Sequence, residues 1–257
     1  MRNSLFAKVN QGNSDKQLVF FPYLGGYVTA FNELIGKIDD DVEIWVANPP
    51  GHGMSSLELV EDMTKLVDMY FHEVIKFMGN ECYFFGHSMG GNIAYFLAKK
   101  MYQLEECNTK PKGLIISASA PPLTMEGLKY SELSDTKLMD IISGYGALPD
   151  ELINDKDLMS MLIPIFRADY KILETGSEIE IGTPLNMDAY LIWGNLDKIE
   201  PVSLLSKWLK YFDCQLTVLP IKNAGHMLIN SHSEIVADLT RKIMAGDYQI
   251  EEDDDIL

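Results

Sequence analysis

The stretch that most constrains how this chain folds is residues 83–94. It begins as a short apolar run that predicts a buried strand, and residues 92–100 that follow are good helix formers. Between them lies Gly86-x-Ser88-x-Gly90, the pattern of a sharp strand-to-helix turn that projects a serine hydroxyl out of a sheet. Glycine suits the flanking positions because the turn leaves no room for larger side chains. The strand before the pattern and the helix after it make Ser88 a predicted nucleophile.

The rest of the chain alternates strand-like and helix-like segments. Apolar runs predict strands at residues 17–21, 42–46, 113–118, 188–193 and 215–219. Helix-compatible segments are 27–38, 57–78, 201–212, and a last helix that begins at a capping box formed by Ser231 and Glu234 and runs to about 244. Strands separated by helices of this length predict parallel pairing with right-handed crossovers. We therefore expect an α/β fold with a mostly parallel central sheet flanked by helices.

The alternation stops at Pro121-Pro122, and residues 123–184 contain no convincing buried strand. Their pattern predicts helical pieces at 133–143, 150–154, 156–166 and 167–174. We expect a helical insertion at about 121–185 within a single domain spanning 1–257. Its methionines (Met139, Met159 and Met161) suit an adaptable lid over an active site. An ordinary helical subdomain with methionines in its core is the alternative.

Composition excludes some classes of function. The chain has 257 residues, of which 47% are hydrophobic, enough for one large core. Its net charge of -17 argues against nonspecific nucleic-acid binding. No apolar run reaches membrane-spanning length, and the N-terminus lacks an apolar signal core, so we expect no membrane association. Three cysteines argue against a disulfide framework and favour a cytoplasmic location.

Three residues are predicted to stand at the carboxyl ends of strands, where open α/β sheets place their sites. Ser88 is the candidate nucleophile, and His226 is the candidate base that removes its proton. Asp197 would accept a hydrogen bond from the other imidazole nitrogen, orienting the ring and stabilising its charged form. The order Ser, Asp, His along the chain is that of the α/β-hydrolase fold, which we therefore predict.

Other histidines and one acid compete for these roles. His232 lies in the predicted capping motif, His72 lies within a long predicted helix, and His87 is expected to pack under the turn. His52 lies in a Pro-Gly turn that could approach the substrate. Asp169 is the alternative acid, but it falls in the helical insertion and not after a strand, so Asp197 is preferred.

An oxyanion hole needs two backbone N–H donors. Met89, directly after the nucleophile, is the predicted first donor. The second is expected from the loop at residues 23–26, where we favour Leu24 and leave Gly25 open. A plain Gly-Gly turn without this role is the alternative.

At this point the residues resemble the type II thioesterases of nonribosomal peptide and polyketide synthases, which are stand-alone α/β-hydrolases. The resemblance covers nearly the whole chain. It is carried by Phe21-Pro22-x-x-Gly25-Gly26, Gly86-His87-Ser88-Met89-Gly90-Gly91, Leu148-Pro149-Asp150-Glu151-Leu152, Arg167-Ala168-Asp169, Gly194-x-x-Asp197 and Gly225-His226. The two motifs inside the insertion are the most specific, because many esterases share the Ser-Asp-His order. One departure is Tyr23-Leu24, where the family often has His-Ala, and the larger Leu24 side chain would narrow an acyl pocket.

The resemblance implies hydrolysis of acyl thioesters from the phosphopantetheine arm of carrier proteins, removing misprimed or stalled acyl groups. It implies the triad Ser88, Asp197 and His226, a lid formed by the insertion, and acyl- or peptidyl-carrier protein domains as partners. The phosphopantetheine belongs to the carrier, so no cofactor or metal is expected, and we expect a monomer. The alternatives are a small-molecule carboxylesterase, a medium-chain acyl-carrier-protein hydrolase of fatty-acid synthesis, and a catalytically idle binding protein. Because carrier proteins are often acidic, we also expect a basic docking face made of Lys129, Lys137, Arg167 and Lys171.

Overall fold

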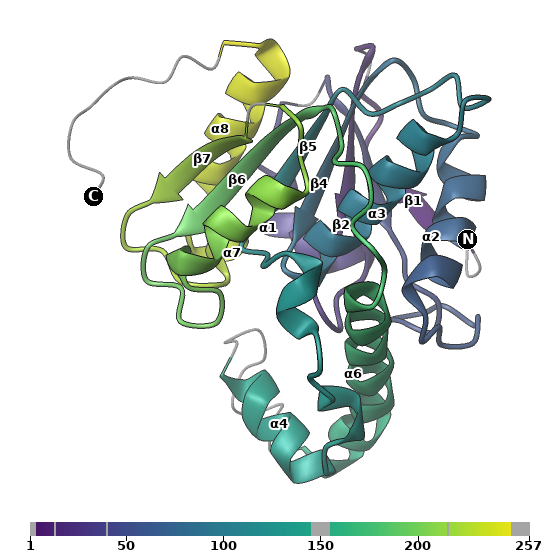
Figure 1. Ribbon diagram of the computed structural model, residues 1–257, viewed down its shortest axis with the longest axis vertical. Helices are drawn as coiled ribbons and strands as arrows, with labels where there is room; N and C mark the ends of the chain where they lie inside the picture. Colours follow the sequence, from purple (N-terminus) through teal and green to yellow (C-terminus); the bar gives the residue numbers. More distant parts are fainter. Residues whose placement is uncertain (1–3, 13, 40, 145–154, 215, 248–257) are drawn as a thin grey trace.

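The computed structural model describes residues 4–12, 14–39, 41–144, 155–214 and 216–247. Seven strands form one sheet in the order β1-β3-β2-β4-β5-β6-β7 (Figure 1). Strand β1 runs antiparallel to β3, and every other neighbouring pair is parallel. The strands are β1 (Phe6–Lys8), β2 (Lys16–Phe21), β3 (Glu43–Ala47), β4 (Glu81–His87), β5 (Gly113–Ser117), β6 (Asp188–Gly194) and β7 (Leu216–Ile221). The predicted mostly parallel sheet is confirmed.

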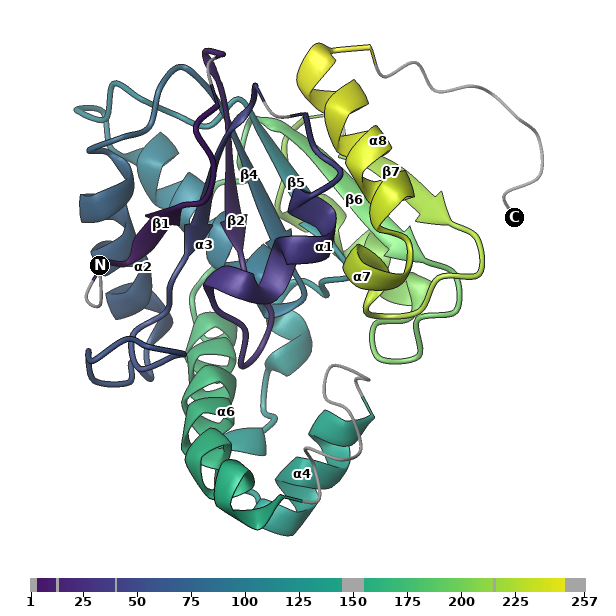
Figure 2. The same ribbon diagram turned by 180° about the vertical axis from the view of Figure 1, so that it is seen from behind.

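Helices cover both faces of the sheet, which explains why the central strands are continuous apolar runs. On one face lie α2 (Met63–Val74) and α3 (Met89–Gln103), packed on a core that includes Phe84 and Leu114. The other face carries α1 (Asn32–Ile35), α7 (Leu228–Ser231) and α8 (Ser233–Ala245), as Figure 2 shows. Consecutive residues of each central strand therefore alternate between two buried cores.

The register of the strands brings the site loops to one edge of the sheet. Phe21 of β2 pairs with Gly86 of β4, so the loop after β2 lies beside the serine turn. Gly194 of β6 pairs with Ile221 of β7, so the loops after these two strands also lie together. The segments that follow β2, β4, β6 and β7 consequently lie at the carboxyl edge of the sheet.

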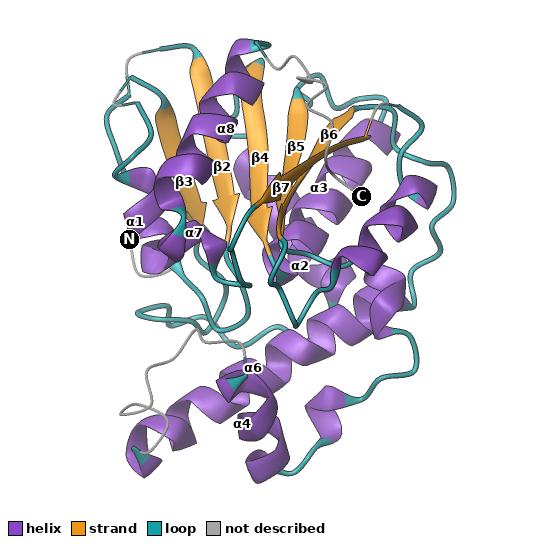
Figure 3. Cartoon of the chain, turned by 90° about the vertical axis from the view of Figure 1, so that its left-hand side faces the viewer, coloured by secondary structure: helices purple, strands orange, loops and turns teal. Residues whose placement is uncertain are grey.

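The described residues between β5 and β6 form helices and no strand of the sheet, as predicted. They form two 3₁₀ helices (Pro122–Met125 and Tyr130–Glu132), α4 (Asp135–Ser143) and α6 (Lys156–Ser177). Figure 3 shows α6 crossing beyond the carboxyl ends of the strands with α4 beside it. The predicted helix 150–154 and the motif 148–152 lie outside the described residues.

Two predicted helices have different boundaries. Helix α6 is a single helix of 22 residues that includes Pro164, so the predicted division at residues 166 and 167 is wrong. Proline removes one backbone hydrogen bond, but α6 packs along α2 and the 3₁₀ helices of the insertion, and this packing carries the helix through the interruption. Helix α2 is shorter than the predicted 57–78, because the Asp62 side chain accepts a hydrogen bond from Lys65 N and caps the helix there.

Other differences concern short elements. The capping box at Ser231 is wrong: Ser231 ends α7, and His232 precedes α8 without any side-chain capping bond. The segment 201–212 contains a 3₁₀ helix, Val202–Lys210, and 27–38 contains a 3₁₀ helix, Val28–Phe31, followed by α1. Strand β1 was not predicted, because three residues at a sheet edge carry almost no periodic signal. Within the described part of the chain, no helix combines the length and apolar character needed to cross a membrane.

Candidate active site

Ser88 occupies a strained backbone position between β4 and α3. Its φ of 54° and ψ of -125° are rare for a residue with a side chain, and α3 begins at the next residue, Met89. The Ser88 N–H donates to the carbonyl oxygen of Ser117 at 2.8 Å, which anchors the turn to the end of β5. Strain of this kind persists only where the surrounding structure holds it, and it is typical of a nucleophile turn.

The two flanking glycines are required by close backbone approach. A Cβ atom at Gly86 would collide with the carbonyl oxygen of Gly90. A Cβ atom at Gly90 would collide with the carbonyl oxygen of Phe21 at the end of β2. The spacing read from the sequence therefore reflects packing of the turn against itself and against the neighbouring strand.

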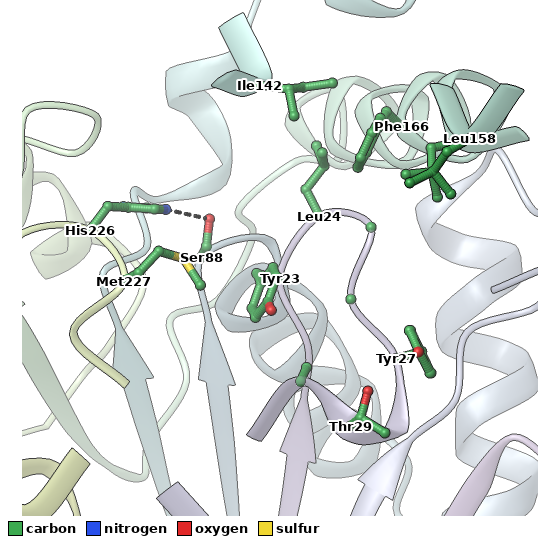
Figure 4. A pocket seen from close by; sticks show the side chains of 14 residues that line it. Tyr23, Leu24, Tyr27, Thr29, Ser88, Ile142, Leu158, Phe166, His226 and Met227 are labelled. Atoms are coloured by element: carbon green, nitrogen blue, oxygen red, sulfur yellow. Dashed lines mark hydrogen bonds between the residues drawn. The ribbon is translucent and has the colours of Figure 1, made fainter. Parts of the chain in front are cut away.

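The structure brings the three predicted residues together. The Nε2 atom of His226 lies 3.1 Å from Ser88 Oγ (Figure 4), and its Nδ1 atom lies 2.9 Å from Asp197 Oδ2. His226 follows β7 and Asp197 follows β6, and both side chains are buried. The series of hydrogen bonds matches the geometry in which a histidine accepts a serine proton while a carboxylate holds the ring.

Backbone donors fix the orientation of Asp197. Its Oδ1 atom accepts hydrogen bonds from Ile199 N at 2.9 Å and Glu200 N at 3.0 Å, which leaves Oδ2 for His226. Since an ionised carboxylate only accepts hydrogen bonds, His226 donates through Nδ1. The neutral ring then presents the unprotonated Nε2 to the serine hydroxyl, as a general base requires.

An apolar pocket of about 330 Å³ lies beside Ser88. The insertion supplies one wall, and Figure 4 shows Ile142 of α4 with Leu158 and Phe166 of α6 on that side. The β2 loop and the His226 loop supply the opposite walls. A second, smaller cavity of about 50 Å³ also reaches Ser88 and is lined by Met89, Ser119 and Glu200. The larger pocket has the volume and the apolar lining that an acyl chain needs.

The loop after β2 contributes Leu24 and Gly25. Leu24 lines both cavities together with Ser88, and Met89 lines the smaller one. The Gly25 N–H donates to the Asp169 carboxylate at 2.7 Å, so this amide is engaged away from the serine. Of the two donors that the sequence left open, Leu24 is the one whose N–H is not directed to Asp169.

The four other histidines lie outside the hydrogen-bonded series of Ser88, His226 and Asp197. His87 is buried and its Nδ1 lies 3.0 Å from Ser117 Oγ; burial first, and the neighbouring His226 second, lower its pKa well below the usual value. His72 is exposed on α2, and His232 precedes α8. His52 is buried and contacts Asp169, the rival acid, at 3.1 Å between Nε2 and Oδ2. The Pro-Gly turn that could have brought His52 to the substrate does not do so, since His52 lines neither cavity beside Ser88.

Sequence reasoning missed Glu200. Burial, followed by the charge of Asp197, raises the pKa of Glu200 to about 8, although a hydrogen bond with the Ala120 backbone opposes the shift. Its side chain lines the smaller cavity beside Ser88. The available signal was its position three residues after Asp197 on a strand-end loop, but burial of a carboxyl cannot be read from that spacing. Across the described ranges, no three His, Cys, Asp or Glu side chains are grouped so as to hold a metal ion.

The strained serine turn, the Ser-His-Asp hydrogen bonds and the parallel sheet define a serine hydrolase of the α/β-hydrolase fold. The family model for the Thioesterase domain matches residues 16–244, and the chain belongs to this family.

Individual relatives are distant. The gramicidin S biosynthesis protein GrsT of Aneurinibacillus migulanus is 27% identical over 66% of this chain and 67% of its own length. Thioesterase PikA5 of Streptomyces venezuelae is 23% identical over 90% of this chain and 82% of its own. Among solved structures, YbtT, a type II thioesterase from the yersiniabactin NRPS/PKS biosynthetic pathway, superposes with a TM-score of 0.84 at 20% identity, covering 96% of this chain and all of that one. At this identity the superposition establishes the fold.

Proposed function

We propose that this protein is a type II thioesterase that hydrolyses acyl thioesters from the phosphopantetheine arm of acyl- or peptidyl-carrier protein domains. Membership of the Thioesterase domain family supports the reaction class. The names of GrsT, PikA5 and YbtT, which refer to gramicidin S biosynthesis, a thioesterase and an NRPS/PKS pathway, support the setting of peptide and polyketide synthases. The enzyme would clear misprimed or stalled acyl groups and return the carrier thiol.

The proposed reaction proceeds in two steps. Ser88 Oγ attacks the thioester carbonyl carbon while His226 Nε2 takes the hydroxyl proton. The N–H groups of Met89 and Leu24 stabilise the negative oxygen of the tetrahedral intermediate. The C–S bond breaks, His226 returns the proton to the thiolate, and the acyl group remains on Ser88. Water activated by His226 then hydrolyses the acyl ester and releases the acid.

Asp197 stabilises the imidazolium that forms in each step. Its two oxygens are already placed by Ile199 N, Glu200 N and His226 Nδ1, so little reorganisation is needed when the charge develops. The phosphopantetheine arrives on the carrier, and the chemistry calls for neither a bound cofactor nor a metal.

The observation that carries this proposal is the Ser88–His226–Asp197 hydrogen-bonded series at the floor of an apolar pocket whose other wall is the insertion. The insertion acts as a lid that shields the acyl-enzyme and accommodates the acyl arm. Leu24 protrudes into the same pocket, so we expect preference for acyl groups smaller than those accepted by relatives with alanine at this position.

The test compares hydrolysis of an acetyl-loaded carrier protein with hydrolysis of p-nitrophenyl acetate, using wild type and Ser88→Ala. We expect kcat/KM for the loaded carrier to exceed that for the ester, and both to fall at least about a thousandfold in Ser88→Ala. Faster ester cleavage with the carrier left loaded would identify a carboxylesterase instead. Faster hydrolysis of a medium-chain acyl-carrier protein than of the acetyl-loaded carrier would identify a medium-chain acyl-carrier-protein hydrolase of fatty-acid synthesis.

We further propose a monomer in a reducing cytoplasm. The triad and both walls of the pocket come from one chain, so a second copy is not required to complete the site. The chain has three cysteines, an odd number that argues against a disulfide framework and is in keeping with a reducing compartment. Sedimentation equilibrium measures the oligomeric state directly.

A further inference from the structure

Asp169 of the insertion makes a buried contact with the loop that carries Leu24. Its Oδ2 atom accepts a hydrogen bond from Gly25 N at 2.7 Å and a second from His52 Nε2 at 3.1 Å. Asp169 is 1% exposed and His52 is 2% exposed, so both bonds lie away from solvent. The second imidazole nitrogen of His52 donates to the carbonyl oxygen of Pro50 at 3.0 Å, which sets the direction of the ring.

A second contact from the same helix face holds the same loop. Phe166 precedes Asp169 by three residues on α6, so the two side chains project from one face of the helix. Gly25 has a φ of 76°, and a Cβ atom there would collide with the Phe166 ring. In Figure 4 the Phe166 side chain points from α6 toward the loop of Leu24. The ring and the carboxylate together leave this loop little freedom.

The charges in the contact balance each other. Burial alone would lower the pKa of His52, but the charge of Asp169 and the hydrogen bonds to Asp169 and Pro50 outweigh burial and raise it. The contact with Asp169 therefore favours the protonated form of His52. A charged acceptor makes a stronger hydrogen bond to a backbone N–H than a neutral one does. Burial of Asp169 without His52 would leave an uncompensated charge.

We infer that Asp169 is a positioning residue for the oxyanion hole, acting on Leu24 through the Gly25 amide, with His52 as its counter-ion. Holding the Gly25 N–H restrains the Leu24–Gly25 peptide plane, and this limits the rotations about the Leu24 Cα atom on which the direction of the Leu24 N–H depends. Helix α6 of the insertion thus helps to hold the oxyanion hole in place. This inference rests on the role proposed for Leu24 and gives the Arg167-Ala168-Asp169 motif a function.

The main test uses Asp169→Asn and Asp169→Ala with a substrate that needs only the serine mechanism, p-nitrophenyl butyrate. An oxyanion donor acts in the transition state more than on bound substrate, so its misplacement lowers kcat while KM stays nearly constant. We expect kcat to fall about 10²- to 10³-fold in Asp169→Ala, with KM changed less than about threefold. Asp169→Asn keeps an acceptor oxygen without the charge and is expected to lie between this variant and wild type.

The matched control is Glu174→Gln on the same helix. Glu174 is also a buried carboxylate, but it accepts from Ser131 N at 2.8 Å and Ser131 Oγ at 2.7 Å, at a distance from the β2 loop along α6. If Asp169 were only structural, substitutions at Asp169 and at Glu174 would lower stability in the same way, and kcat of the folded variants would stay at the wild-type value. A kcat loss confined to the Asp169 variants supports positioning, and an unchanged kcat in folded Asp169→Asn overturns it.

A measurement on wild type covers the case in which the variants do not fold. The Gly25 amide, held by a buried carboxylate, is expected to exchange its hydrogen at least about a hundredfold more slowly than the amide of exposed Tyr27 in the same loop region. Equal exchange rates at the two sites would contradict the inference. Absence of Ser88-dependent turnover in wild type would instead contradict the proposed function, so the two failures are distinguishable.

Discussion

At the scale of single residues, the chemistry of the site depends on the surroundings of each buried carboxyl group. Asp197 receives two backbone N–H bonds and a histidine, so its negative charge is compensated. Glu200, three residues later, is partly buried beside that charge, and its pKa rises to about 8. Two carboxyl groups on one loop thus have very different surroundings, and only Glu200 has a pKa raised toward neutral pH.

Glu200 leads to a prediction about stability and pH. The folded protein keeps a proton on Glu200 that the unfolded chain releases above about pH 4.5, so Glu200 reduces the free energy of unfolding progressively as the pH rises to about 8. Glutamine cannot ionise, so Glu200→Gln does not lose free energy of unfolding in this way as the pH rises. We expect its advantage over wild type to grow across this range by at most about 1.4 kcal/mol per pH unit, and then to level off.

Urea unfolding of wild type and variant between pH 5 and pH 8.5 measures this difference. Glu61→Gln, which removes an exposed carboxyl, is the control and should follow wild type at every pH. A constant difference between Glu200→Gln and wild type would show that Glu200 is ionised in the folded protein.

At the scale of elements, the insertion is joined to the sheet and to itself by different residues of one motif. Asp169 reaches the β2 loop, whereas Arg167 reaches the segment that leads into α4. The Arg167 guanidinium donates to the carbonyl oxygens of Ser131 and Leu133 and to the Asp135 carboxylate. The fork shape of the guanidinium, which lysine lacks, allows all three bonds at once.

Arg167→Ala is therefore expected to loosen the α4 arm without unfolding the sheet. Loss of bonds from a charged donor to backbone carbonyls costs about 1 to 3 kcal/mol locally. Hydrogen exchange followed by mass spectrometry should show faster exchange at residues 131–143, while β4 and β5 stay protected. Lys137→Ala, at an exposed position of α4, is the control. Unchanged exchange at 131–143 would mean that other contacts hold the arm.

At the scale of the whole molecule, the net charge of -17 dominates long-range interactions. Three of the four cations expected to form a basic docking face are paired with carboxylates of the insertion. These ion pairs are Lys129–Glu132 at 3.0 Å, Arg167–Asp135 at 2.6 Å and Lys171–Glu174 at 3.5 Å. These carboxylates offset the charge of the three cations, and with the net charge of -17 we expect an acidic carrier to meet net repulsion, so the basic docking face stays a prediction.

Salt dependence tests this conclusion. Raising NaCl from 20 to 200 mM shortens the Debye length from roughly 20 Å to roughly 7 Å and screens repulsion between like charges. We expect kcat/KM for an acidic acyl-carrier protein to rise several-fold, because encounter is no longer opposed. An uncharged acyl-pantetheine thioester should show no change. A fall in carrier turnover with salt would instead indicate attraction by a local basic surface.

The sequence alone supports the parallel sheet, the helical insertion and the three residues that meet at the site. Apolar runs, turn residues and glycine spacing are local properties, and the edge at which parallel strands end follows from them. Ser88, Asp197 and His226 could be predicted because each lies in the turn or loop that follows a strand.

The tertiary structure decided what depends on contacts between distant segments. Packing against α2 carries α6 through Pro164, and the Asp62 cap shortens α2, although periodicity favoured other boundaries. The pairing of His52 with Asp169, 117 positions apart, and the bond from Asp169 to Gly25 have no local signal. The raised pKa of Glu200 likewise depends on burial by other segments. Local sequence patterns thus identify the reacting groups, while packing determines which amide Asp169 holds and which carboxyl has a raised pKa.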